Sequence, residues 1–368
     1  MTYTAVIFGG PSPEHDVSIL TGLQAARELA RSGHDVAALY WSKAGDWYRV
    51  RPDLEGSDFV QGVPGAAEPV QLVVAPGGGF VTAKKGLWSK ASPIDVDVAV
   101  VCCHGGPGED GSLQAALDLA GVAYTGPTVA GAALGMDKFA FGAAVAAAGL
   151  PALPRLLLTE SAGPGALRGP CIVKPRFGGS SIGIEVVDSF ETALALRNTS
   201  AHLRAGAVVE PYLPQSFDLN VAVRLAPTPQ VSAVERPVRS GGAILGYADK
   251  YAGGEGMVSA PRELPAKIGD DERAAIVDMA LAVAQLCGVR GVQRVDFLSD
   301  DGKLYVNEIN TVPGSLAKHL WVEPEVPFAT LLADMVAEAK AKPSTAWTTA
   351  GSDGSALRSA GAIAGKLS

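Results

Sequence analysis

The amino-acid sequence predicts an open, parallel α/β domain at the N-terminus, followed by smaller units of the α+β class. Two segments carry the first prediction, because TAVIF at residues 4–8 and DVDVAVVCC at residues 95–103 are almost continuously apolar, as strands of a parallel sheet usually are. From residue 170 onward the strands become short and alternate between apolar and polar residues, which indicates a largely antiparallel unit.

The N-terminal elements follow a β-α-β order. The first strand ends at Gly9-Gly10, residues 17–29 have the apolar spacing of a helix, and HDVAALYW is the next strand. The strand at residues 95–103 runs into the Gly-rich loop and helix of HGGPGEDGSLQAALDLAG, and AYTG is expected to close the domain as a short strand. Open α/β sheets bind ligands at the loops that follow their strands, so we expect a ligand site there.

The rest of the chain is divided by prolines, glycines and turn residues. Residues 127–150 predict helix, which Pro151 and Pro154 end. Residues 341–368 are rich in Ser, Ala and Gly without a period, so we expect a flexible tail. The other expected elements are, in order, the strands CIVKP, GIEVV, AVVEPYL, NVAVRL and VSAVERPVR, the long Gly-rich loop GGAILGYADKYAGGEGMVSAP, a helix at residues 270–287 and the hairpin VQRVDFLSDDGKLYVNEIN, turned at Asp301-Gly302.

Composition narrows the class of protein. With 368 residues, 48% hydrophobic and 18% charged, the chain is long and apolar enough for an enzyme of two or three domains. A net charge of −8 argues against nucleic acid or an anionic membrane as a general partner. The N-terminus is interpreted as a strand, no apolar run reaches about 18 residues, and Cys102, Cys103, Cys171 and Cys287 lie in apolar runs, so we expect a cytoplasmic protein with reduced core cysteines.

The hairpin near the C-terminus carries a candidate metal site. Glu308 and Asn310 are two residues apart and so share one face of their strand, which Asp296 on the paired arm can also share. Carboxylate and carboxamide oxygens suit Mg²⁺, although a solvated strand face would explain the alternation about equally well. Arg294 lies on the same face, where a guanidinium either holds a phosphoryl oxygen or oxyanion or pairs with a neighbouring carboxylate.

The segment KPRFGGSSIG at residues 174–183 allows two interpretations. Gly179-Ser-Ser181-Ile-Gly183 matches the G-x-S-x-G pattern of hydrolase nucleophiles, and His319 follows downstream, but GIEVV predicts a strand where such an elbow needs a helix. A Gly/Ser loop between strands instead presents N–H groups and hydroxyls to phosphates, with Lys174 just before it as a point charge. We favour the phosphate loop and keep the hydrolase as the alternative.

Other polar residues stand beside glycines or strand ends. Glu14-His-Asp-Val-Ser18 follows the first strand and by itself reads as a helix cap. His104 opens a segment with four glycines, which implies close approach of the backbone to something else. The remaining single candidates are Lys138, Lys250 and Tyr251.

Taken together, these segments resemble the D-alanine–D-alanine ligases of the ATP-grasp superfamily. The motifs GGPSPEHDVS, HGGPGEDGSLQ, YTG…GMDK, IVKP…GGSSIG, ADKY, R-V-D and NEINTVPG occur in the order of that family, from residue 4 to about residue 340. The resemblance implies an N-terminal α/β domain at residues 1–126, a small central ATP-grasp subdomain at 127–213, a C-terminal ATP-grasp subdomain with the metal site at 214–340, and a tail at 341–368.

The resemblance also implies how ATP is held. Two lysines would contact nucleotide and phosphates, Glu210 would lie at the adenine hinge, and Asp218 stands where the family usually has a glutamate for the ribose. Lys250 and Tyr251 would belong to a mobile loop that closes over the γ-phosphate. The implied ATP-binding residues are Lys138, Lys174, Ser180, Ser181, Glu210, Asp218 and Lys250.

The implied reaction has two steps. The carboxylate of a first D-alanine attacks the γ-phosphate to give an acylphosphate, and the amine of a second amino acid then attacks the acyl carbon. Two Mg²⁺ ions (with Mn²⁺ as a substitute) would be held by Asp296, Glu308 and Asn310. The implied catalytic residues are Glu14, Ser180, Tyr251, Arg294 and Gly314, and the implied substrate-binding residues are Glu14, Ser18, His104, Arg294, Gly314, His319 and Leu320.

One departure concerns the second substrate. The family pattern places a serine, which helps to hold the carboxylate of the second substrate, where this chain has His319 after Lys318. The resemblance favours D-Ala-D-Ala for peptidoglycan, made by a cytoplasmic homodimer, and His319 keeps open an acceptor other than D-alanine. A non-catalytic ATP-binding relative is disfavoured, because the candidate metal ligands and Arg294 are all present.

Overall fold

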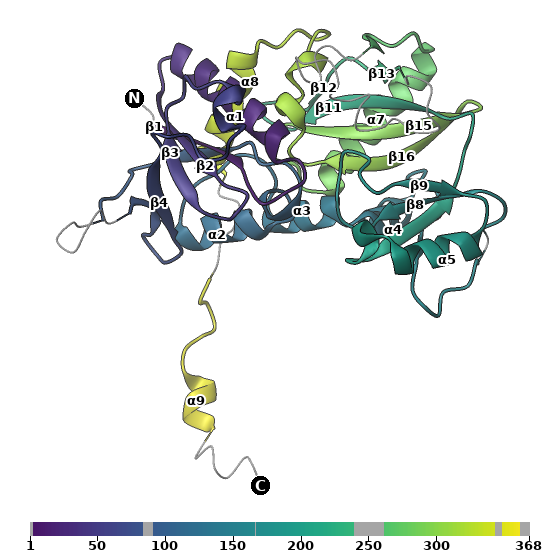
Figure 1. Cartoon of the computed structure of the whole chain (residues 1–368), viewed down its shortest axis with the longest axis horizontal. Helices are drawn as coiled ribbons and strands as arrows, with labels where there is room; N and C mark the ends of the chain where they lie inside the picture. Colours follow the sequence, from purple (N-terminus) through teal and green to yellow (C-terminus); the bar gives the residue numbers. More distant parts are fainter. Residues whose placement is uncertain (1–2, 84–90, 166, 239–260, 343–347, 361–368) are drawn as a thin grey trace.

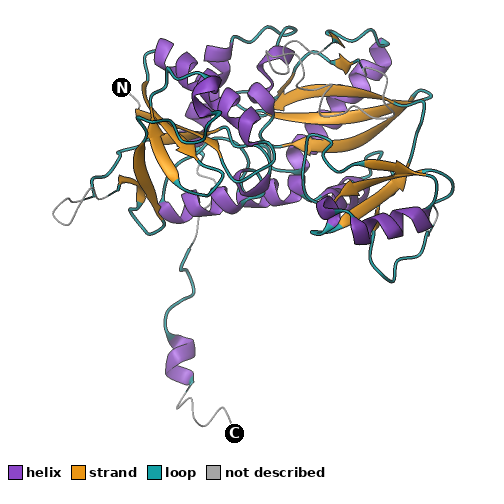
Figure 2. Ribbon diagram, viewed as in Figure 1, coloured by secondary structure: helices purple, strands orange, loops and turns teal. Residues whose placement is uncertain are grey.

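The computed structural model describes residues 3–83, 91–165, 167–238, 261–342 and 348–360. Figure 1 shows a mixed N-terminal sheet on one side of the molecule and two four-stranded sheets on the other, with α2 and α3 running along the base. Figure 2 shows that helices cover the outer faces of these sheets. This arrangement is the ATP-grasp type of α/β and α+β fold that the sequence predicts.

The N-terminal sheet has the strand order β5-β4-β3-β2-β1-β6. Its centre is parallel as predicted, because β1 pairs in parallel with both β2 and β6, whereas β3, β4 and β5 add antiparallel pairs that the sequence analysis does not predict. The expected closing strand AYTG is reduced to one parallel bridge between Ala99 and Tyr124. The elements are β1 (Tyr3–Gly9), α1 (His15–Arg31), β2 (Asp35–Trp41), β3 (Trp47–Val50), η1 (Gly56–Phe59), β4 (Glu68–Val73), β5 (Gly79–Thr82), β6 (Val98–Val101), η2 (Gly106–Gly108) and α2 (Ser112–Ala120).

Both faces of the central strands are buried, which explains their apolar runs. Val6 and Phe8 of β1 point into one core, and Ala5 and Ile7 point into another. The first core is closed by α1 and by α8 (Phe328–Ala341), a helix from the far end of the chain. Helix α8 therefore completes the core of the first domain. The predicted division of the chain into domains at residues 126, 213 and 340 stays a prediction.

Two further four-stranded sheets follow. The smaller one has the order β7-β10-β8-β9 and the larger one β12-β11-β15-β16. The expected hairpin and the helix expected at 270–287 are confirmed, the helix ending one residue earlier, but the expected strand VSAVERPVR is only two short pieces, β12 and β13. The elements are α3 (Val129–Met136), α4 (Lys138–Ala147), β7 (Leu156–Leu157), β8 (Cys171–Pro175), β9 (Glu185–Val187), α5 (Phe190–Thr199), η3 (Ala201–Leu203), β10 (Ala207–Pro211), β11 (Phe217–Arg224), β12 (Gln230–Val231), β13 (Arg236–Pro237), β14 (Arg262–Glu263), α7 (Asp270–Leu286), β15 (Gln293–Asp300), β16 (Lys303–Asn310) and η5 (Gly314–Leu320).

Several expectations concern segments at the margins of this fold. Figure 1 shows the described part of the tail, with α9 (Ser355–Ser359), leading away from the body. The expected loop over the nucleotide, with Lys250 and Tyr251, lies outside the described residues.

All four cysteines are free and buried, as expected. Within the described residues, no helix is long and apolar enough to cross a membrane.

Helix α1 packs against β1 without space for a side chain at Gly22. A Cβ atom there would lie 2.4 Å from the Cβ of Phe8, well inside van der Waals contact. Phe8 itself is fully buried and cannot move into solvent. The close approach brings the start of α1, with Glu14, next to the end of β1.

We expect Gly22→Ala to destabilise the protein by about 1–3 kcal/mol, because overpacking outweighs the gain in helix propensity. Ala30→Gly, at an exposed position of the same helix, should also be unfavourable, by about 1 kcal/mol, through propensity alone. Urea unfolding monitored by circular dichroism measures both changes. A Gly22→Ala variant that is more stable than the parent would contradict the packing described here.

Candidate active site

A cleft lies between the small and the large sheet. Its lining comes from strands β8, β10, β11, β15 and β16, so the two sheets face each other across it. Apolar side chains such as Ile172 and Leu213 line the cleft together with charged ones such as Asp296 and Glu308. The lining residues include Ile172, Lys174, Ser181, Glu210, Leu213, Asp218, Asn220, Arg294, Asp296, Leu298, Asn307 and Glu308.

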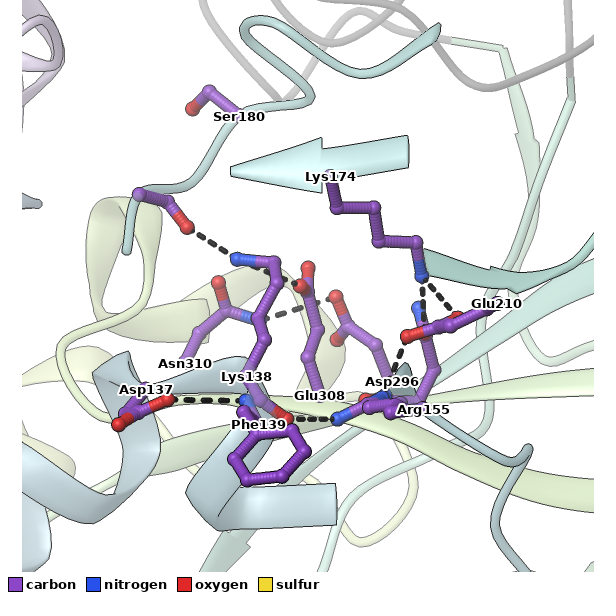
Figure 3. A network of polar contacts seen from close by, with 12 residues as sticks. Asp137, Lys138, Phe139, Arg155, Lys174, Ser180, Glu210, Asp296, Glu308 and Asn310 are labelled. Carbon is purple, nitrogen blue, oxygen red and sulfur yellow. Dashed lines mark hydrogen bonds and ion pairs between the residues drawn. The ribbon is translucent and has the colours of Figure 1, made fainter. Parts of the chain in front are cut away.

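A buried ion-pair network closes one end of this cleft. Glu210 is fully buried, and its two carboxylate oxygens accept hydrogen bonds from Arg155 Nε at 2.5 Å and Lys174 Nζ at 2.8 Å. Burial alone would raise the pKa of Glu210, but the two cations lower it on balance. Figure 3 shows the Lys174 and Arg155 side chains converging on this carboxylate.

Arg155 also reaches the other elements of the site. One of its Nη atoms donates to the carbonyl of Lys138 at 2.7 Å, and the other donates to the carbonyl of Asn307. Its side chain packs against Gly142 of α4, where a Cβ would lie 2.7 Å from Arg155 Cδ. One guanidinium thus connects strand β10, the first turn of α4 and strand β16.

A β-bulge in β16 brings two successive side chains into the same cleft. The pairing register of β15 and β16 shifts between Asp296 and Phe297, so that Glu308 lies opposite Asp296 and Val306 opposite Phe297. Asn307 is the extra residue, and its Oδ1 accepts a hydrogen bond from Lys174 Nζ at 3.1 Å. In a regular strand Asn307 and Glu308 would point to opposite faces.

The predicted metal ligands lie together on the hairpin of β15 and β16. Asp296 and Glu308 are direct cross-strand neighbours, and Asn310 Nδ2 donates to Asp296 Oδ2 at 3.1 Å. Arg294 donates twice to the Asp296 carboxylate, at 2.6 and 2.7 Å, which is one of the two interpretations that the sequence leaves open. The metal role of these residues remains a prediction, since no cluster of three or more His, Cys, Asp or Glu side chains suited to a metal occurs in the described part of the chain.

Lys138 lies next to these carboxylates. It is the first residue of α4, and its Nζ is 3.7 Å from Glu308 Oε2 and donates to the carbonyl of Gly178. Burial lowers the pKa of Lys138, which the neighbouring Glu308 partly offsets and Lys174 reinforces. Figure 3 shows the amine of Lys138 directed toward Glu308.

The loop after β8 spans the gap to the N-terminal domain. Ser180 Oγ donates a short hydrogen bond to Glu14 Oε1, and both Ser180 and Ser181 have positive φ values, 53° and 58°. A Cβ on Gly105 or Gly179 would lie 2.5 or 2.8 Å from Glu14 Oε2, so a side chain at either position would displace this carboxylate. Two of the implied catalytic residues, Glu14 and Ser180, are therefore in contact, and a third, Tyr251, lies outside the described residues.

The hydrolase alternative is wrong for this loop. The chain continues from Gly183 directly into strand β9, whereas a nucleophile elbow places a helix after its serine. His319 is also on a different element, η5, where its Nε2 lies 3.4 Å from Glu235 Oε1 rather than beside Ser181.

The candidate substrate residues occupy different surroundings. Ser18 is fully buried, accepts a hydrogen bond from the Gly9 N–H at 2.7 Å and donates to the Cys102 carbonyl at 2.8 Å, so its hydroxyl joins the ends of β1 and β6. His104 is also buried and contacts the Val312 carbonyl. Leu320 is fully buried in the core shared with α1 and α8. Roles of these three residues in substrate binding remain predictions.

His319 is nearly buried and lies close to charged side chains. Its side chain is 9% exposed and lies beside the Glu235 carboxylate, but neither ring nitrogen has hydrogen-bond geometry to any described residue. Glu235 also accepts from Arg262 at 2.8 Å and from Asn220 at 3.2 Å. Burial would raise the pKa of Glu235, yet His319 and Arg262 lower it to about 2.

Some residues of the site are not found by the sequence analysis. Arg155 is an arginine among the apolar residues of LPALPRLLL, and that isolated charge is a usable signal of a buried ion pair. Asn307 and Asn220 give no such signal, because the bulge and the strand pairing that place them are tertiary features. Glu109 lies in the quoted motif HGGPGEDGSLQ and Thr21 in the expected helix at residues 17–29, and the sequence analysis gives neither residue a role although both contact the turn after β16.

The sequence matches known protein families over most of its length. Sequence profiles described as "D-ala D-ala ligase N-terminus" and "D-ala D-ala ligase C-terminus" match residues 3–127 and 160–337. The chain belongs to the D-alanine–D-alanine ligase family. This family consists of ATP-dependent, ADP-forming ligases with the ATP-grasp fold, so the chain is an enzyme of that class.

Individual relatives cover nearly the whole chain. A D-alanine–D-alanine ligase of Parasynechococcus marenigrum is 33% identical over 365 residues, covering 92% of this chain and 98% of the relative. One from Mycobacterium bovis is 32% identical over 364 residues, covering 92% and 95%. The fold also matches the D-alanine–D-alanine ligase of Coxiella burnetii with a TM-score of 0.75 at 21% identity, covering 93% and 96%, and the VanG D-Ala:D-Ser ligase of Enterococcus faecalis with 0.72 at 24%, covering 92% and 99%.

We expect Arg155→Met to lower stability by about 3 kcal/mol and to raise the KM for ATP tenfold or more, because it leaves Glu210 with one cation and frees two carbonyls. Arg155→Lys should recover part of both losses. Urea unfolding and steady-state kinetics measure the changes. Arg49→Met is the matched control, since its ion pair with Glu68 is partly exposed and should contribute at most about 1 kcal/mol; equal effects of the two methionine variants would refute the role of Arg155.

Proposed function

We propose that this enzyme joins two D-alanine molecules at the expense of ATP, giving D-Ala-D-Ala for peptidoglycan synthesis in the cytoplasm. The observation that carries the proposal is the meeting of the phosphate loop, the two lysines and the carboxylate hairpin around one cleft. Family membership and relatives of 32–33% identity named for this reaction support it. The comparisons give no support to a different acceptor.

The adenine would enter the cleft beside Glu210 and Leu213. Lys174 then lies along the nucleotide, and Lys138 lies toward the phosphates near Glu308. Asp218, on β11, lines the same cleft and is the candidate for the ribose hydroxyls. Ser180 and Ser181 sit in the loop whose backbone N–H groups would cover the phosphates.

The donor set on the hairpin of β15 and β16 fits Mg²⁺. Asp296 and Glu308 face each other directly, and two carboxylates at that spacing need positive charge between or beside them. Arg294 and Lys138 supply it here, and the carboxamide of Asn310 adds a third oxygen ligand once its amide is turned. When bound, Mg²⁺ would neutralise charge on the transferring phosphoryl group.

The chain's own residues account for the remaining steps. The carboxylate oxygen of the first D-alanine bonds to the γ-phosphorus, and the bond to the bridging oxygen breaks to release ADP. The second amine then adds to the acyl carbon and loses its proton, and phosphate leaves with the electrons of its C–O bond. Arg294 and the N–H of Gly314 are the donors proposed for the oxyanion that forms between these events. The substrates are thus small molecules, and a homodimer remains our expectation for the assembly.

The first test is Mg²⁺-dependent release of phosphate from ATP with D-alanine alone, with the dipeptide identified by mass spectrometry. We expect release with D-alanine as the only amino acid, and loss of at least a thousandfold in Glu308→Ala, which removes a proposed metal ligand. Release that requires a different amino acid as acceptor would overturn the D-Ala-D-Ala product. Substantial activity of Glu308→Ala at saturating Mg²⁺ would overturn the metal site.

We expect His319→Ser to change the preference among acceptor amino acids more than the KM for ATP, because His319 lies near the proposed second-substrate pocket and far from the adenine end. Competition between D-alanine, D-serine and D-lactate, with products separated by mass spectrometry, measures the preference. Lys303→Ser is the control, because Lys303 is exposed at the start of β16 and does not belong to η5. An unchanged acceptor profile would remove His319 from the pocket.

A further inference from the structure

The turn that follows β16 has a left-handed backbone conformation that residues with side chains rarely adopt. Ser315, Leu316 and Ala317 have φ values of 49°, 49° and 50°, so three successive residues with side chains lie in the left-handed region. Each such residue costs about 1–2 kcal/mol relative to the right-handed form. Strain of this kind persists only where surrounding contacts fix it.

Two side chains from the loop after β6 hold the start of the turn. The N–H of Val312 donates to Glu109 Oε1 at 2.9 Å, and its carbonyl accepts from His104 Nδ1 at 2.7 Å. Thr311 Oγ1 donates to the same Glu109 oxygen at 3.2 Å, and the other oxygen accepts from the Gly105 N–H at 2.8 Å. Both polar groups of the Val312 backbone are therefore bound by the N-terminal domain.

A third side chain holds the far side of the turn. The N–H of Ser315 donates to Thr21 Oγ1 of helix α1 at 3.0 Å, across 294 positions of sequence. The same hydroxyl lies 2.8 Å from His104 Nε2. Thr21 is 1% exposed, so no water competes for its oxygen.

The donor and acceptor of each hydrogen bond among His104, Thr21 and Ser315 can be assigned in only one consistent way. His104 Nδ1 faces a carbonyl and must carry the proton. Burial lowers the pKa of His104, partly offset by Glu14, so the ring is neutral and its Nε2 accepts. Thr21 therefore donates its hydroxyl proton to His104 and accepts from the Ser315 N–H. Each donor in this row of hydrogen bonds then has an acceptor.

Gly314 lies between the two points that are held, Val312 and Ser315. No described residue accepts a hydrogen bond from its N–H, while the next two N–H groups are used by Thr21 and by the Pro313 carbonyl. The N–H of Gly314 therefore lies between two held positions and has no acceptor among the described residues. Such a preorganised donor is what a developing oxyanion requires.

We propose that Thr21 is a positioning residue for amide-bond formation, which acts by fixing the Gly314 N–H through its hydrogen bond to Ser315. His104 and Glu109 hold the opposite end of the same turn. This inference rests on the proposed function, because it assigns the Gly314 N–H to the oxyanion of the second step. Thr21 itself touches no substrate.

Thr21→Val tests the proposal, because it keeps the shape of the side chain and removes the acceptor for Ser315. Removal of a whole oxyanion donor costs about 10²–10³ in kcat, so a displaced donor should slow dipeptide formation about tenfold or more. Formation of the acylphosphate should change much less. ATP labelled with ¹⁸O in the β–γ bridge reports that first step, since reversible phosphoryl transfer scrambles the label into non-bridging positions.

The decisive quantity is the ratio of isotope scrambling to dipeptide formation at one D-alanine concentration. We expect this ratio to rise about tenfold in Thr21→Val and to return toward the parental value in Thr21→Ser, which restores the hydroxyl. Thr125→Val is the matched control, because Thr125 is equally buried and accepts one backbone N–H, from Val101 at 3.2 Å, rather than an N–H of the turn. It should lower stability with no change in the ratio.

Two outcomes would overturn the proposal. Loss of dipeptide formation with an unchanged ratio would show that Thr21 supports only the fold, and unchanged turnover in Thr21→Val would show that the turn holds its shape without it. Failure of the proposed function is distinguishable, because the parent enzyme would then release no phosphate with D-alanine before any variant is compared.

Discussion

The buried Glu210 carboxylate is the centre on which the cleft depends. A fully buried charge is tolerated only when it is paired, and here Arg155 and Lys174 each take one oxygen. Because Arg155 also binds the carbonyls of Lys138 and Asn307, the same pairing connects the small sheet, α4 and the hairpin of β15 and β16. The proposed nucleotide site and the proposed phosphoryl site are in this way linked by one guanidinium.

A second constraint is that the candidate catalytic residues come from segments far apart in the sequence. Glu14 meets Ser180 across 166 positions of sequence, and Val312 meets His104 and Glu109 across more than 200. Glycines make these approaches close, since any side chain at Gly105 or Gly179 would collide with the Glu14 carboxylate. Strained backbone occurs at the same places, at Ser180, Ser181 and Ser315 to Ala317, where cross-domain contacts are able to hold it.

Helix α8 connects these parts to the first domain. Residues of α8 share a core with β1, β6 and α1, and Leu320 of η5 packs in the same core. The strained turn is therefore seated on the first domain through apolar contacts as well as through Thr21, His104 and Glu109. Movement of the N-terminal domain relative to the hairpin would change the orientation of the Gly314 N–H.

The sequence by itself determined much of the secondary structure and the choice of most candidate residues, because local patterns carry them, although β3, β4 and β5 were not predicted. Alternation in NEIN put Glu308 and Asn310 on one face, and apolar runs identified the doubly covered strands. Only the tertiary structure decided the rest. The bulge that turns Asn307 into the cleft, the pairing of Arg155 with Glu210, and the placement of Glu235 beside His319 depend on strand register and on contacts between distant segments. No local pattern encodes such contacts, since the free energy that selects them arises only when the sheets pack together.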